Sequence, residues 1–146
     1  MTNLLKIAPL ALAATTALAA PAFAGQCAAE GTNALANAPT MPKGVTDTVI
    51  GSIDLKNEIG VDGRLLRTRR LVVQPGGIVP LHSHVDRPAL IVTVSGAITE
   101  YRSNCTKPIE HKAGDISREA DGISHYWVNH GNVPAVLLSS DVFHGM

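Results

Sequence analysis

The chain has 146 residues, with 12 Lys or Arg against 12 Asp or Glu, and its aromatic residues are one Trp, two Tyr and two Phe. This length suits one compact domain and leaves little room for two. Balanced charge and few aromatic residues provide neither a basic stripe nor a stacking surface for DNA or RNA, so we expect no nucleic-acid partner.

The first 24 residues differ in composition from the rest. Lys6 precedes an Ala- and Leu-rich stretch over Ile7–Ala20, and a small-x-small sequence follows at Ala22–Phe23–Ala24. These are the three parts of a cleavable secretory signal peptide. The alternative is a membrane anchor, but the apolar run is short for a span and Pro9 interrupts it. We therefore expect a signal peptide at 1–24, no stable membrane insertion after cleavage, and a secreted or periplasmic protein.

Two cysteines, Cys27 and Cys105, remain after this cleavage. An exported protein with two cysteines is a candidate for one disulfide. The chain-entropy model assigns roughly 4 kcal/mol to a bridge that closes so long a loop. Two free thiols are the alternative, because the sequence does not give the distance between the two Cα atoms.

Residues 25–44 are mostly small or polar and include two prolines, and we expect an extended lead-in there. We place the folded domain at 45–146, where short β-rich runs are separated by Gly, Pro, Asn and Asp. The runs cover 45–55, 65–73, 90–94, 97–101, 115–119, 125–128 and 135–142. Their spacing predicts an all-β sandwich or barrel, and no stretch is long enough for a substantial core helix.

Arginines occupy both faces of the predicted strand 65–73. Alternation puts Arg67 and Arg69 on one side and Arg70 on the other. A solvated sheet face is the usual reason for such a pattern. The alternative is that one of Arg64, Arg67, Arg69 and Arg70 lines a pocket and binds an anionic group with two hydrogen bonds.

Three histidines form a possible metal site. His82 and His84 lie two residues apart, so on a strand both imidazoles point to the same face and can reach one ion. His125 lies on a different predicted strand and can approach the first pair across a barrel. We expect His111 and His130 on loops or pointing outward, and His144 lies close to the C-terminus.

The histidine spacings resemble the two motifs of the cupin superfamily, G(x)5HxH(x)3,4E(x)6G and G(x)5PxG(x)2H(x)3N. The matching residues are Gly76, His82, His84 and Gly96 in the first motif, and Gly114, Gly122, His125 and Asn129 in the second. The resemblance covers residues 64–142. It implies a cupin-type jelly-roll β-barrel with the ligand site inside its mouth, and a divalent metal ion on His82, His84 and His125.

Two positions depart from the motifs. Ala89 stands where most cupins have a metal-binding Glu, and Ala120 replaces a turn Pro. Three neutral imidazoles still make a workable metal site, and its higher net charge favours an anionic ligand or a metal-bound hydroxide. Glu100 and Glu119 are not at the expected offset, and we expect them at the surface. The alternative is a cupin that has lost its metal and keeps polar residues in a substrate cavity.

Three further residues are candidates for the substrate pocket. Trp127 and Asn129 follow His125 at i+2 and i+4, so alternation directs them inward. For Trp127 the alternative is simple core packing. Arg87, two residues before Ala89, is the candidate for a polar contact at the pocket entrance, or alternatively for a salt bridge with a nearby acid such as Asp86.

Cupins perform oxygenation, isomerisation, decarboxylation and plain ligand binding on one barrel, so the fold does not select the reaction. The first hypothesis is an exported three-histidine, metal-dependent dioxygenase or related enzyme acting on a small anionic or polar substrate. The ion is Fe, Zn, Mn, Ni or Cu, and zinc would point instead to hydrolysis or lyase activity. The second is a periplasmic ligand-binding or sensing module without turnover. The third is an assembly part, such as a homodimer formed through the sheets or the lead-in.

Overall fold

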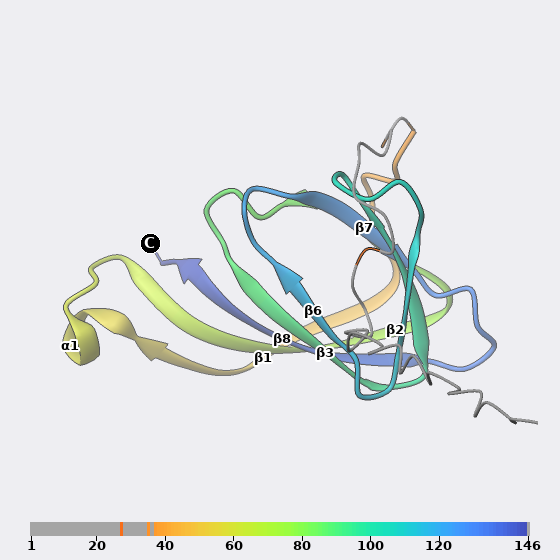
Figure 1. The fold of residues 1–146 in the computed structure, drawn as a ribbon. Coiled ribbons are helices and arrows are strands. Elements are labelled where there is room, and N and C mark those ends of the chain that lie inside the picture. The colour runs from red at the N-terminus through yellow and green to blue at the C-terminus, as the bar shows by residue number, and fades with distance from the viewer. Residues whose placement is uncertain (1–26, 28–34, 36, 146) are drawn as a thin grey trace, which may run out of the picture.

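A computed structural model describes residues 27, 35 and 37–145 of the chain, so the predicted signal peptide at 1–24 lies outside the described residues. Nearly all regular structure is β, which confirms the all-β prediction. In chain order the elements are β1 (Lys43–Asp54), α1 (Leu55–Ile59), β2 (Arg64–Ser83), β3 (Ala89–Ser95), β4 (Ala97–Arg102), β5 (Ile109–Lys112), β6 (Ile116–Glu119), β7 (Ser124–Val128) and β8 (Ala135–His144). α1, at the left of Figure 1, lies at the tip of the hairpin between β1 and β2.

The eight strands form one sheet with the order β5-β4-β7-β2-β8-β3-β6, and β1 pairs with β2. The long strand β2 joins the two halves of the molecule. Its first half, residues 64–73, pairs with β8 on one side and β1 on the other, whereas its end, residues 78–83, pairs with β7. The sheet therefore bends around a shared interior as a jelly roll (Figure 1).

Two glycines of the predicted motifs lie where the chain turns sharply. Gly76 has φ of +70° between the two halves of β2, and Gly96 has φ of +74° between β3 and β4. A Cβ at Gly96 would lie 2.6 Å from the carbonyl oxygen of Pro134. Any other residue at Gly96 would force the β3–β4 turn away from β8.

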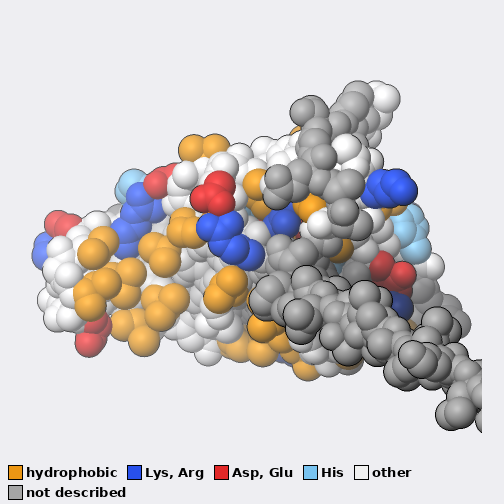
Figure 2. All heavy atoms as spheres, viewed as in Figure 1, with side chains coloured by type: hydrophobic (Ala, Val, Ile, Leu, Met, Phe, Trp, Pro, Cys, Tyr) orange, Lys and Arg blue, Asp and Glu red, His pale blue; other side chains and the backbone are white. Residues whose placement is uncertain are grey.

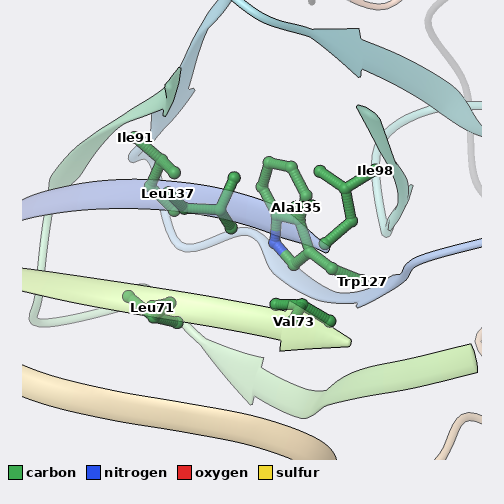
Figure 3. Packing of buried hydrophobic residues seen from close by; sticks show 7 residues of the cluster. All are labelled: Leu71, Val73, Ile91, Ile98, Trp127, Ala135 and Leu137. Carbon is green, nitrogen blue, oxygen red and sulfur yellow. The ribbon is translucent and has the colours of Figure 1, made fainter. Parts of the chain in front are cut away.

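The apolar core lies at one end of the interior (Figure 3). It consists of Leu71, Val73, Ile91, Ile98, Trp127, Ala135 and Leu137. Alternation along β8 shows how the interior changes character, because the buried residues run from Ala135 and Leu137 to Ser139 and Asp141. The other end of the interior is therefore polar, and the candidate site lies there.

Hydrophobic side chains are also exposed on the outside of the sheet (Figure 2). They include Val49 and Ile53 of β1, Leu66 of β2 and Leu90 of β3, each more than 40% exposed. Within residues 37–145 no helix has the length and apolar character needed to cross a membrane.

The structure joins Cys27 and Cys105, which are 78 positions apart in sequence, in a disulfide with Cα atoms 5.6 Å apart. This ties the N-terminal lead-in to the segment between β4 and β5. A second contact of the lead-in is the backbone of Pro39, whose carbonyl accepts a hydrogen bond of 2.7 Å from the Leu81 amide.

We expect a Cys27→Ser/Cys105→Ser double variant to lose about 2 to 4 kcal/mol of unfolding free energy, because the open chain gains entropy when the loop is released. Urea unfolding with and without reductant measures this. The wild type in reductant should match the variant, and reductant should leave the variant unchanged. A midpoint insensitive to both changes would contradict the stabilising role.

Candidate metal centre

The structure brings His82, His84 and His125 together at the polar end of the interior. Nε2 of His125 lies 3.0 Å from Nε2 of His82 and 3.1 Å from Nε2 of His84. β7 pairs with the end of β2 so that His125 lies directly across from His82. The i, i+2 spacing places His84 beside them, and the three side chains form a group whose ligand atoms lie within 4.8 Å of one another.

The other ring nitrogen of each histidine is held by an oxygen that accepts a hydrogen bond. Nδ1 of His82 donates to the Pro80 carbonyl at 2.8 Å, and Nδ1 of His84 to the Arg87 carbonyl at 2.7 Å. A backbone carbonyl can only accept, so the proton of each neutral ring lies on Nδ1 and the Nε2 lone pair is free. Both free lone pairs face His125.

Burial favours the neutral form of two of these rings. It lowers the pKa of His82 to about 3 and that of His84 to about 4, and the charges of His125 and Arg87 act in the same direction. A histidine must be neutral at the ligating nitrogen to bind a metal. These two rings are therefore in the metal-binding form at neutral pH without the help of an ion.

A buried polar network lies behind His125 and corrects three predictions. Glu100 and Glu119, expected at the surface, are both 0% exposed, as is His111, which was expected on a loop or pointing outward. Glu100 accepts hydrogen bonds from His125 Nδ1 at 2.6 Å and His111 Nε2 at 2.9 Å. Arg102 reaches both carboxylates at 3.0 Å. The expectation failed because these groups pair with one another inside the barrel, which offsets much of the usual cost of burial, although Arg102 Nε and His111 Nδ1 have no hydrogen-bond partner among the described residues.

The two carboxyl groups titrate differently. Burial acts to raise the pKa of Glu100, but hydrogen bonds from His111 and His125 outweigh it and hold that pKa well below its usual range. Burial and the nearby charge of Glu100 raise the pKa of Glu119 despite the opposing charge of His125. Glu100 is therefore the ionised partner that keeps the His125 proton on Nδ1.

Glu100, Glu119 and His125 form a second group of potential ligand atoms. In this group His125 presents Nδ1, which already donates to Glu100. Arg102 adds a positive charge beside both carboxylates. An ion at this point would have to displace these contacts, so the three histidines are the better metal site.

A cavity of about 190 Å³ opens beside the histidines. This is smaller than the pockets of roughly 300 to 1,000 Å³ that hold drug-sized ligands, so it suits a small molecule. His82 and His84 lie on its wall, with Trp127, Arg87 and Arg69. The remaining lining residues are Asp47, Leu71, Val79, Pro80, Ile91, Leu137 and Ser139.

The structure separates the three predicted pocket residues. Arg87 and Trp127 line the cavity. Trp127, 1% exposed, also belongs to the core. Asn129 does not line the cavity, which corrects that prediction. It lies one residue beyond β7, where its amide nitrogen donates to the carbonyls of Val73 and Val133 and its oxygen accepts from Gly131.

Two of the β2 arginines, Arg67 and Arg69, also differ from the solvated face that was the usual expectation. Arg67 donates two hydrogen bonds, of 3.0 and 2.8 Å, to the buried carboxylate of Asp141. Arg69 lines the cavity, which is the alternative considered for this group of residues. Arg70 is exposed. Arg64 binds Asp86 at the rim. Arg87, for which Asp86 was the suggested partner, pairs with Asp141 at 3.4 Å.

Of the remaining histidines, His130 is exposed and its Nε2 lies 3.0 Å from the Tyr101 hydroxyl. His144 is exposed at the end of β8 and contacts Asp86. Neither belongs to the groups of potential metal ligands among the described residues.

The burial of Glu100 and Arg102 could have been predicted from alternation in β4. Both residues share the inward face of Ile98.

Comparison with known proteins gives a consistent result. Residues 69–141, half of the chain, match the model of the cupin domain family. Auxin-binding protein ABP19b of Prunus persica is 34% identical over 84 residues, which cover 56% of this chain and 40% of that protein. Germin-like protein 8-14 of Oryza sativa subsp. japonica is 32% identical over 120 residues, covering 79% and 54%. The chain thus spans about half or less of the length of these relatives.

Solved structures show the same fold at lower identity. A predicted oxalate decarboxylase from Thermotoga maritima superposes with a TM-score of 0.56 at 20% identity, covering 74% of this chain and 95% of that one. A recombinant oxalate oxidase in complex with glycolate gives a TM-score of 0.53 at 21% identity, covering 69% and 52%. Sequence family, jelly-roll topology and histidine arrangement agree, and the chain belongs to the cupin domain family.

Proposed function

We propose that this protein is an exported cupin that holds a divalent metal ion on His82, His84 and His125 and acts as a dioxygenase-like enzyme on a small anionic or polar substrate. The convergence of three Nε2 atoms carries the proposal. Lone pairs that face one another at 3.0 to 3.1 Å repel unless a cation lies among them. A proton on one ring bonds well to only one neighbour at a time, whereas a metal ion accepts all three lone pairs.

The residues of the chain have separable tasks in this proposal. When bound, the ion supplies Lewis-acid or redox chemistry at its open positions. Glu100 fixes the orientation of the His125 ring. Leu71, Ile91 and Leu137 make an apolar wall that limits water in the cavity. Arg69 and Arg87 place positive charge where an anionic substrate would enter.

Elemental analysis tests the metal site directly. We expect about one transition-metal ion per chain in the purified wild type and none in a His82→Ala/His84→Ala variant. Metal content that is far below one ion per chain and unchanged by the two substitutions would eliminate the site. Oxygen uptake by iron-loaded protein with a panel of small carboxylates then tests the dioxygenase reaction.

A non-catalytic ligand-binding or sensing module is the second candidate. Catalysis of this kind commonly uses a free acid or base within reach of the substrate. Among the described cavity residues the only carboxylate is Asp47, which is paired with Arg69. Glu100 and Glu119 lie behind His125 instead. Saturable ligand binding by metal-loaded protein without oxygen uptake or product would favour this module.

Export remains part of the proposal. It rests on the three-part sequence pattern of residues 1–24, and the disulfide between Cys27 and Cys105 supports an oxidising compartment. Mass spectrometry of protein recovered from outside the cytoplasm tests it. A mature N-terminus at Gly25 is the expected result, and an intact Met1 in that fraction would contradict it.

A homodimer also remains a prediction. The exposed hydrophobic side chains of β1, β2 and β3, including Ile53, Leu66 and Leu90, form the kind of surface that a second copy would cover. We expect sedimentation to give a dimer for the wild type and a monomer for Leu66→Lys/Leu90→Lys, with Glu110→Gln of β5 as the control. A monomeric wild type would contradict this prediction.

A further inference from the structure

Three arginines and two acids form a charged cluster at the polar end of the cavity. Arg67 is fully engaged with Asp141, to which it donates two hydrogen bonds, and its guanidinium also lies 3.7 Å from the centre of the Phe143 ring. Arg87 reaches Asp141 through a single nitrogen at 3.4 Å, and Arg69 only approaches it at 3.7 Å. The Asp141 carboxylate is thus occupied mainly by Arg67.

The cluster carries more positive than negative charge. Arg67, Arg69 and Arg87 face Asp141 and Asp47, which leaves one positive charge uncompensated. The acid on Arg69, Asp47, is itself 38% exposed and lies at the rim.

We propose that Arg87 and Arg69 form an anion subsite that binds the carboxylate of a small organic acid, whose second oxygen function then faces His82 and His84. This inference rests on the proposed metal-dependent function and names the class of substrate for that site.

The lining of the cavity supports a ligand with one polar end at the arginines and the other at the histidines. Arg69 and Arg87 share it with His82 and His84. Much of the remaining wall is apolar, with the aliphatic side chains of Leu71, Val79, Ile91 and Leu137 beside the indole ring of Trp127. A ligand in this cavity therefore gains polar contacts mainly at its two ends. A short carboxylic acid with a neighbouring hydroxyl or carbonyl has the matching polarity.

Asp141 positions the arginines but does not occupy all of their hydrogen-bond donors. It is buried at the end of the inward-facing run of β8, where Arg67 anchors it across the β2–β8 pair. The contact of Arg87 with Asp141 uses Nη1. A guanidinium has five donors in a planar fork, so one such contact leaves other N–H groups for an incoming carboxylate.

Trp127 is the only tryptophan of the chain and lines this cavity, so its fluorescence reports binding without an activity assay. The probe is zinc-loaded protein titrated with glycolate and with its neutral isostere glycolamide. We expect saturable binding of glycolate and at least about tenfold weaker binding of glycolamide, because a charged hydrogen bond contributes roughly 1.5 to 3 kcal/mol.

The variants separate the subsite from the metal centre. Arg87→Gln should weaken glycolate binding by at least about tenfold while zinc content and melting temperature stay close to wild type. Arg87→Lys should retain part of the affinity because it keeps the charge but loses the fork. Arg70→Gln, on the exposed opposite face, is the matched control and should bind glycolate like wild type.

The possible failures are distinguishable. Wild-type protein that holds one zinc per chain but does not bind glycolate, or binds glycolate and glycolamide equally, would overturn the subsite and leave the metal centre standing. Wild-type affinity in Arg87→Gln would overturn it as well. Protein that holds no zinc yet binds glycolate through Arg87 would overturn the metal centre and support the subsite.

Discussion

We expect His84→Gln to weaken metal binding at least about a hundredfold. Loss of a residue that only orients a metal ligand typically costs 10- to 100-fold in affinity, so loss of a ligand should cost no less. His84 is 2% exposed and its Nε2 lies 3.1 Å from that of His125. Only two of the three converging nitrogens would remain, and the glutamine side chain cannot place a comparable lone pair at the same point.

The measurement is a competition titration with a chromophoric chelator, followed by elemental analysis of dialysed protein. His130→Gln is the matched control, because His130 is an exposed histidine that contacts Tyr101 and lies outside the site. The control should bind metal like wild type. Undiminished metal affinity in His84→Gln would mean that the ion is held elsewhere, and this result would contradict the proposed metal centre.

Much of the candidate metal centre could be predicted because its arrangement depends on local periodicity. Two histidines at i and i+2 on a strand must share a face, and this holds whatever the strand pairs with. The third histidine of the group, His125, required the spacing of a second motif, because nothing local links it to His82. In the structure the link is the antiparallel register of β2 and β7, which places the two residues opposite each other.

The network behind the site could not be predicted in the same way. Parity in β4 puts Glu100 on the face of Ile98, but the usual exposure of glutamate argued against burial. The conflict is resolved by partners inside the barrel, since His111 of β5, His125 of β7 and Arg102 of the same strand β4 all contact the carboxylate. Sequence periodicity indicates which way a side chain points and not which partners it meets.

For Asn129 alternation predicted burial correctly but assigned the side chain to the wrong surroundings. Its parity with His125 and Trp127 predicted a side chain in the pocket, and the residue is indeed buried. β7 ends at Val128, however, so the strand no longer directs Asn129 toward the cavity. Its amide instead binds backbone groups of the following turn and of β2. The amide thereby fixes the segment that leads into β8.

Glu100 links the stability of the fold to the strength of the site. It is 0% exposed and accepts hydrogen bonds from His125 and His111, with Arg102 at 3.0 Å. We expect Glu100→Gln to lose about 3 to 5 kcal/mol of unfolding free energy, because the buried guanidinium of Arg102 loses one of its two carboxylates. Metal affinity should fall about 10- to 100-fold, because the His125 ring is no longer held by an ionised acceptor.

Urea unfolding and chelator competition measure the two effects, and long-range ¹H–¹⁵N NMR of the histidine rings separates them. A positioning role predicts that the fixed Nδ1 proton of His125 in wild type is redistributed between the two ring nitrogens in folded Glu100→Gln. Glu110→Gln is the control, because Glu110 is an exposed carboxylate of β5 that contacts only Lys112 among the described ion pairs. If Glu100→Gln unfolds earlier but keeps both the wild-type proton position and the wild-type metal affinity, Glu100 stabilises the barrel and has no part in orienting the ligand.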